Sequence, residues 1–209
     1  MISLYSKHLE NAVNEISKLP GIGKRSALRL ALHLIKQDEA NVQLLTDRIN
    51  KLKTDVVFCR QCHNISDNEI CDICANPKRD NGVICVVQDI RDVIAIENTH
   101  QYLGVYHVLG GVISPMDGIG IQQLTLQQLF DRVERGDVKE IILALPATVE
   151  GDTTNFFIYK NIQDKVPTIT TIARGIGVGE ELEYADEATL GRSIVARTAF
   201  GTAYGNKHE

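Results

Sequence analysis

The sequence predicts a multidomain α/β protein, and three observations along the chain lead to that class. Residues 1–55 carry apolar side chains at helical spacing. Residues 56–79 are polar and rich in cysteine. From residue 80 onward, apolar runs typical of buried strands alternate with helical patterns, as in proteins built from a sheet with helices packed on it. We therefore expect a helical N-terminal part, a small metal-stabilised module and a larger α/β part.

The composition is that of an ordinary globular protein: 209 residues, 44% hydrophobic and 23% charged. No apolar run approaches the roughly 18 residues of a membrane span. The N-terminus carries charges where a signal peptide needs its apolar core, so we expect a cytoplasmic protein whose cysteines are thiols or metal ligands. Residues 1–79 have a net charge of +3 and residues 80–209 one of −8. This balance argues against a protein that coats nucleic acid over its whole surface, but allows a basic patch in the first third.

The first 55 residues should form a small helical bundle with a tight turn at residues 20–23. Three apolar series at helical spacing predict its helices: Leu9, Val13, Ile16 and Leu19; Leu28, Ala31, Leu32 and Ile35; and Val42, Leu45, Ile49 and Leu52. Such a bundle is too thin to be stable unless it packs against another surface.

The turn between the first two helices matches a helix–hairpin–helix, with the sequence LPGIGKRSA over residues 19–27. Gly21 and Gly23 let the backbone turn tightly and aim free amides outward from a helix start, which is a phosphate site. The side chains of Lys24, Arg25 and Arg29 follow, and the two arginines lie about 40° apart around the helix. These five residues are the predicted DNA contacts. The competing interpretation is an ordinary tight turn beside a solvated basic face.

Four cysteines predict a structural zinc site. They stand as two Cys-x-x-Cys pairs separated by eight residues: Cys59, Cys62, Cys71 and Cys74. Two such turns supply four thiolates to one tetrahedral ion, which leaves no position open for substrate or activated water. The alternatives are two redox dithiols or incidental thiols. His63 adjoins the cluster as a bystander, and Cys85 is interpreted as a small buried side chain in a strand.

The last 130 residues alternate strand and helix patterns. Continuous apolar runs at residues 82–87, 140–145 and 167–172 are typical of parallel strands buried on both faces, and residues 126–133 show a helical pattern between them. We expect an α/β layer structure in this part of the chain.

The order of these motifs resembles that of the RecR family of bacterial recombination mediators. Beyond the hairpin and the cysteines, the resemblance rests on the strings ICVVQDIRDVIAIE, YHVLGGVISPMDGIG, LPATVEGDTT and IARGIGVGEELEYADEATLGR. It implies four parts: a helix–hairpin–helix domain (residues 1–55), a four-cysteine zinc finger (56–79), a Toprim-like domain (80–177) and a C-terminal segment (178–209). The last part would carry a Walker-B-like stretch at residues 182–187.

The sequence departs from the pattern of Toprim enzymes, which hold a magnesium ion with an acidic residue after the first strand and an Asp-x-Asp after a later one. Gln88 stands at the first position, and no Asp-x-Asp follows the strand at residues 140–145. No P-loop is present either. We therefore expect a binding module and no catalytic residues, with Asp89, Asp92 and Glu150 as part of an acidic surface for a protein partner.

The resemblance implies a DNA-binding mediator of recombination and repair. Such a protein acts with RecO, and in some settings RecF, to load RecA at single-stranded gaps, independently of RecBC. It forms a homo-tetrameric ring built from dimers and holds one structural zinc ion per chain. Two other functions stay open: a magnesium-dependent Toprim phosphodiester enzyme, and a zinc-stabilised scaffold that binds no nucleic acid.

Overall fold

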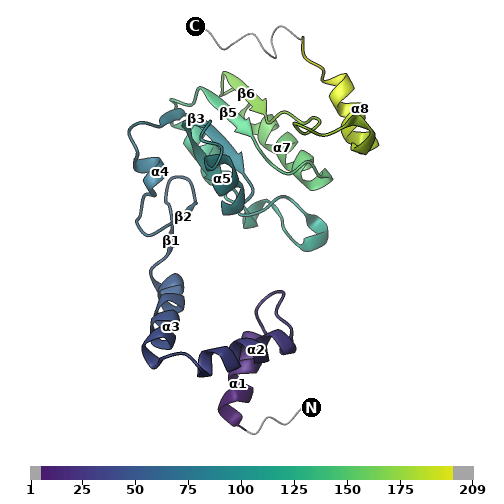
Figure 1. Cartoon of the computed structure of the whole chain (residues 1–209). Coiled ribbons are helices and arrows are strands. Elements are labelled where there is room, and N and C mark those ends of the chain that lie inside the picture. Colours follow the sequence, from purple (N-terminus) through teal and green to yellow (C-terminus); the bar gives the residue numbers. More distant parts are fainter. Residues whose placement is uncertain (1–5, 200–209) are drawn as a thin grey trace. The chain divides into compact units, whose positions relative to one another are not determined.

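A computed structural model describes residues 6–199 and divides the chain into two compact units, residues 1–57 and residues 58–209. The first unit is helical. The second holds the cysteine-rich segment, a parallel sheet with its helices and a short C-terminal helix (Figure 1). The predicted multidomain α/β class is confirmed. The predicted segments 1–55 and 178–209 extend into residues 1–5 and 200–209, which lie outside the described residues.

The described part of the N-terminal unit consists of α1 (Lys7–Ile16), α2 (Lys24–Ile35) and α3 (Glu39–Thr54). Ser6 begins α1, because its side chain accepts a hydrogen bond from the N–H of Leu9. Helices α1 and α2 pack through a small core formed by Val13, Ala27 and Ala31. The small side chains of the two alanines let the helix axes approach closely.

Helix α3 buries none of its side chains in this structure. Its large apolar residues are exposed: Leu44, Leu45, Ile49 and Leu52. The bundle is as thin as the sequence predicts, and its exposed apolar side chains can pack against another part of the protein or a partner.

The cysteine-rich segment is a two-stranded hairpin followed by one helical turn. Its elements are β1 (Val57–Phe58), β2 (Ile65–Ser66) and α4 (Asp72–Ala75). The hairpin turns tightly around the first cysteine pair: the N–H of Cys59 donates to the carbonyl of Asn64 at 2.8 Å, and the N–H of His63 donates to the carbonyl of Cys59 at 2.9 Å. We call residues 58–75 the cysteine module.

Four parallel strands form the main sheet in the order β4-β3-β5-β6. Their bounds are β3 (Asp80–Val87), β4 (Gly104–Val108), β5 (Glu140–Leu143) and β6 (Thr168–Thr171). Cys85 on β3 lies opposite Tyr106 on β4 and Ile142 on β5. Strand β3 is therefore central, and β4 is an edge strand.

The connections between the strands contain three helices and two 3₁₀ turns: α5 (Ile90–Glu97), η1 (Pro115–Asp117), η2 (Ile121–Gln123), α6 (Leu126–Glu134) and α7 (Val149–Ile162). Along β3, Ile84 and Val86 join the core formed with α6 and α7, while Cys85 and Val87 join a second core with Val93 of α5. The strand is thus buried on both faces, as its continuous apolar run predicts.

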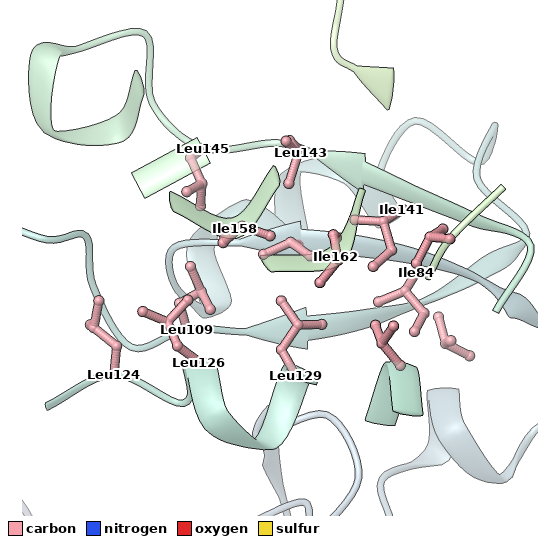
Figure 2. Close-up of a cluster of buried hydrophobic side chains, with 14 residues drawn as sticks. Ile84, Leu109, Leu124, Leu126, Leu129, Ile141, Leu143, Leu145, Ile158 and Ile162 are labelled. Atoms are coloured by element: carbon pink, nitrogen blue, oxygen red, sulfur yellow. The ribbon is translucent and has the colours of Figure 1, made fainter. Parts of the chain in front are cut away.

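Figure 2 shows the larger core, in which side chains of α6 and α7 meet the strands. Leu129, Ile158 and Ile162 lie against the strand residues Ile84 and Ile141, and all five side chains are fully buried. This core fixes the positions of the loops at the carboxyl ends of β3 and β5, where a Toprim enzyme would hold its metal.

The strands expected at residues 82–87, 140–145 and 167–172 are β3, β5 and β6, and the helix expected at residues 126–133 is α6. Strand β4 was not predicted, because His107 interrupts the apolar run in its sequence GVYHV. All five of its residues are nonetheless buried.

After β6 the chain forms η3 (Leu182–Tyr184) and α8 (Glu187–Val195). In the Walker-B-like stretch, Asp186 begins α8, since its side chain accepts the N–H of Thr189 at 2.9 Å. Among the described residues, no helix is both long and apolar enough to cross a membrane.

Candidate nucleic-acid interface and metal centre

The hairpin between α1 and α2 is a β-turn that its sequence specifies. The N–H of Ile22 donates to the carbonyl of Leu19 at 3.1 Å, so Pro20 and Gly21 occupy the two central positions. Proline supplies the fixed φ of the first position. Gly21 has a φ of +77°, which side chains disfavour, so glycine is the residue that fits there.

The turn leaves the start of α2 open. Gly23 is the N-cap residue and offers no side chain to cap the helix. The first helical hydrogen bond runs from the N–H of Ala27 to the carbonyl of Gly23, at 2.9 Å. The N–H groups of Lys24, Arg25 and Ser26 therefore have no acceptor within the helix, and together with the helix dipole they favour an anion such as a phosphate.

Three cations follow directly from this open helix end. The side chains of Lys24, Arg25 and Arg29 are exposed. Within residues 6–199, none of the three forms an ion pair or a side-chain hydrogen bond. The nearby Lys18, by contrast, pairs with Glu15 at 2.7 Å. The five predicted contact residues thus lie on one short stretch of backbone, where free amides and unpaired positive charges can meet a phosphate chain.

The hairpin and α4 bring the four cysteines together. Cys59 and Cys62 come from the turn after β1, Cys71 is the N-cap residue of α4, and Cys74 lies within it. All four side chains are buried, and their sulfur atoms lie within 4.8 Å of one another. His63 is not part of this group.

The pKa values of the thiols indicate that the cluster needs a bound cation before all four can ionise. Burial raises the pKa of Cys59, but backbone N–H groups, that of Cys71 first, donate to its sulfur and bring the pKa down to about 7. A hydrogen bond to Cys74, together with burial, raises the pKa of Cys62 far above its usual value, and burial raises that of Cys71 to about 11. Four crowded thiols cannot all ionise without a divalent ion between them.

The donor set fits one tetrahedral zinc ion. Zinc–sulfur bonds of about 2.3 Å place the sulfurs of a tetrahedron roughly 3.8 Å apart. The sulfurs of Cys62 and Cys71 are 3.5 Å apart, and all four lie within 4.8 Å of one another. With four thiolates the ion would have no open position, so its contribution is to the fold of the module.

At the carboxyl end of β3, two of the predicted acidic residues hold the backbone in place. Asp89 is the N-cap residue of α5, and its side chain accepts the N–H of Arg91 at 2.7 Å and pairs with the Arg91 guanidinium. That guanidinium and the N–H bonds hold the pKa of Asp89 below its usual value. Asp92 accepts the N–H groups of Gln88 and Asp89, each at 3.1 Å. Both carboxylates are therefore occupied within the capping box.

The other acidic residues near this edge differ in their surroundings. Asp152 on α7 pairs with Arg174 at 2.6 Å, and this contact lowers the pKa of Asp152. Glu150 lies exposed in the first turn of α7. Among the described residues the four cysteines are the one group of three or more potential ligands close enough to hold a metal, so these carboxylates do not form one.

Sequence reasoning did not single out a layer of buried polar side chains between the cysteine module and the sheet. It contains His107 of β4 and Arg132 of α6, which are 0% and 9% exposed. The ring of His107 packs edge-on against His63, with 5.3 Å between the centroids, and its Nε2 lies 2.9 Å from the carbonyl of Thr125. A charged residue beside the apolar stripe of α6 was the available signal, but such residues usually face solvent.

Comparisons with known proteins match almost the whole chain. Family models match in four consecutive stretches. They are the RecR helix-hairpin-helix at residues 9–53, the RecR zinc finger domain with four cysteines at 56–76, the Toprim domain at 82–173, and the RecR C-terminal region at 175–198.

Curated relatives match over nearly their full length. The chain is 59% identical to "Recombination protein RecR" of Bacteroides thetaiotaomicron, over 92% of this chain and 94% of that protein. It is 58% identical to the protein of the same name from Flavobacterium johnsoniae, over 96% and 98%. Identity to the Cytophaga hutchinsonii protein of that name is 57%, over 94% and 97%. All three names describe a recombination protein, and none describes an enzyme.

Proposed function

The chain belongs to the RecR family of recombination proteins, and on that premise we propose that it is a DNA-binding adaptor of recombinational repair. In this proposal it acts with RecO, and in some settings with RecF, to promote the loading of RecA at single-stranded gaps, independently of RecBC. The observation that carries the DNA-binding part is the start of α2, where free backbone amides and three unpaired cations share one exposed surface.

Contacts of this kind bind phosphate groups. Amides at a helix start and the flexible cations Lys24, Arg25 and Arg29 neutralise backbone charge, and none of them needs a base edge. Binding should therefore be independent of DNA sequence and should weaken as salt rises, because bound phosphates release counterions.

The carboxyl edge of the sheet supports an adaptor over a magnesium-dependent enzyme. Gln88 supplies a neutral amide at the position of the first Toprim acid. Asp89 and Asp92 cap α5, and Asp152 is paired with Arg174. A magnesium ion needs carboxylates that are free to coordinate it, and these side chains already have partners.

We assign partner binding to the acidic surface that includes Asp89, Asp92 and Glu150. The net charge of −8 over residues 80–209 supports a basic partner surface. Glu150 is the most exposed of the three, so it is the first position at which to test this assignment.

We further propose a division of labour along the chain and an assembled state. Residues 1–55 bind DNA, residues 56–79 are stabilised by zinc, and residues 80–177 bind protein partners. Residues 178–209 form the C-terminal segment. The exposed apolar side chains of α2 and α3 support assembly into a homo-tetramer built from dimers. The protein works in the cytoplasm and joins the nucleoid when it is bound to DNA.

A reconstituted loading assay tests this function. Gapped DNA coated with single-strand-binding protein is mixed with RecA, RecO, RecF and this protein, and RecA filament growth is followed in magnesium buffer. We expect Arg25→Ala with Arg29→Ala to lose loading. The control is Lys51→Ala with Lys53→Ala. It also removes two positive charges, in this case from the last turn of α3, and it should retain RecA loading. Full loading by the arginine variant would refute the hairpin assignment, and cut strands would favour the enzyme.

A further inference from the structure

The cysteine module meets the free edge of the sheet at the end of β4. In a strand, alternate residues direct their backbone groups to the same side, so Tyr106 and Val108 both face away from β3. The N–H of Val108 donates to the carbonyl of Cys62 at 2.8 Å. The carbonyl of Tyr106 accepts a hydrogen bond from Nη1 of Arg132, also at 2.8 Å. The side chain of Arg132 thus ends where the module meets the sheet.

Arg132 is a buried cation without an acidic partner. The residue is 9% exposed, and its Nη2 is buried with no hydrogen-bond acceptor in the part of the chain that the structure describes. No Asp or Glu among residues 6–199 forms an ion pair with it. A buried charge of this kind is costly unless an opposite charge compensates it.

The carboxylates of Asp131 and Asp137 line the same cavity as Arg132, but neither forms an ion pair with it. The other source of negative charge at this edge of β4 is the thiol cluster, which the bond from Val108 to Cys62 holds there.

His107 is uncharged at neutral pH, because burial lowers its pKa to about 3. Burial lowers the pKa of Arg132 itself, and the sulfurs of Cys74 and Cys62 act against this effect when they are ionised. When one Zn²⁺ is bound by four thiolates, the centre carries a net charge of −2.

We propose that Arg132 is the counter-charge of the zinc–tetrathiolate centre, and that this pairing fastens the cysteine module to the parallel sheet. One end of the guanidinium is held by the carbonyl of Tyr106 on β4, and its positive charge offsets half of the charge of the metal centre. The zinc ion and the sheet are then coupled. Loss of the metal or of the arginine weakens the contact between the cysteine module and the sheet. Arg132 is a positioning residue in this account, since it touches no substrate.

Three substitutions separate the charge of Arg132 from its hydrogen bond. Arg132→Lys keeps the charge, Arg132→Gln keeps a donor for Tyr106 without the charge, and Arg132→Met removes both. Zinc affinity is measured by competition with a chromophoric chelator, and Co²⁺ spectra check that four sulfurs still bind the metal. The control is Arg135→Gln, an exposed position at the end of the same helix.

We expect the Gln and Met variants to bind zinc about 10- to 100-fold more weakly, which is the usual loss when a partner outside the ligand shell is removed. The Lys variant should stay within about threefold of the wild type, and the Arg135 control should not change. If Arg132→Gln keeps wild-type zinc affinity, Arg132 acts through its hydrogen bond alone and the proposal is overturned. If Arg132→Lys loses as much affinity as Arg132→Gln, the positive charge is not what stabilises the metal centre, and the proposal is overturned as well.

A measurement on the wild-type chain covers the case in which a variant fails to fold. The side-chain N–H signals of Arg132 are followed by NMR while zinc is removed with a chelator and then restored. We expect these signals to shift and to exchange faster with water when the metal leaves. Signals that are the same with and without zinc, in a chain whose sheet stays folded, would overturn the proposal.

Discussion

Helix α7 approaches the loop after β5 so closely that replacing one glycine should destabilise the fold. Gly151 is buried in the first turn of α7, and its N–H donates to the side chain of Thr148 at 3.2 Å. A Cβ added there would lie 2.0 Å from the carbonyl oxygen of Pro146, whereas ordinary contact begins near 3.4 Å. Gly151→Ala therefore requires the loop to move by more than an ångström. This loop occupies the carboxyl edge of the sheet, where the Toprim pattern places its Asp-x-Asp.

The magnitude follows from two opposing terms. Overpacking a tight contact costs about 1–3 kcal/mol, and the obstacle here is backbone that continues into β5, so the upper part of that range applies. Alanine gains at most about 1 kcal/mol over glycine in a helix. We expect Gly151→Ala to lower the free energy of unfolding by about 2 kcal/mol. The matched control is Gly191→Ala in α8, where a Cβ meets nothing within 4 Å, and it should be neutral or stabilising.

Urea denaturation followed by circular dichroism measures both variants against the wild type. The reasoning is refuted if Gly151→Ala unfolds within about 0.5 kcal/mol of the wild type. A loss as large in Gly191→Ala would also count against it, because the effect would then not depend on the contact with Pro146.

Three further predictions concern the metal, the acid response and the sheet edge. Cys74→Ser should hold well under one zinc per chain, and a chelator that lowers the melting temperature of the wild type should not lower that of the variant further. The guanidinium of Arg79 and the hydroxyl of Tyr106 hold the pKa of Glu97 below its usual value, so this carboxylate stabilises the fold above its unfolded pKa of about 4.3 and stops doing so as the pH falls through the folded pKa. Glu97→Gln should therefore be less stable than the wild type at pH 7 and should lose less of its stability between about pH 5 and 3; equal urea midpoints at pH 7 would contradict this. Gln88→Glu should gain no magnesium-dependent cleavage of gapped DNA, since Asp152 remains paired with Arg174; cut strands on a denaturing gel would show that the edge can hold a metal.

The elements that the sequence predicts best are those with a single physical explanation. The run Gly82–Val87 is apolar throughout because both faces of β3 are covered, so its pattern alone indicates a parallel strand. Pro20 and Gly21 fit the two central positions of one kind of turn, and the two Cys-x-x-Cys pairs need one ion between them.

What the sequence does not predict depends on contacts between distant residues. His107 is a polar residue in the sequence of β4. It is nonetheless buried, because Thr125, 18 residues away, provides its hydrogen-bond partner. In the sequence Arg132 is typical of a solvated helix face, but in the structure it is buried and donates to the carbonyl of Tyr106, 26 residues away. Asp89 and Asp92 look like a free acidic pair in the sequence, and only the structure shows that both cap α5.

The salt dependence of DNA binding tests the central claim most directly. Binding of labelled gapped DNA is measured from about 50 to 200 mM salt for the wild type, for Arg25→Ala with Arg29→Ala, and for the Lys51 and Lys53 control. If both arginines contact phosphates, the slope of log K against log salt should become shallower by roughly 1.4 to 1.8 in the arginine variant and stay the same in the control. An arginine variant with the wild-type affinity and slope would contradict the assignment of DNA binding to the hairpin.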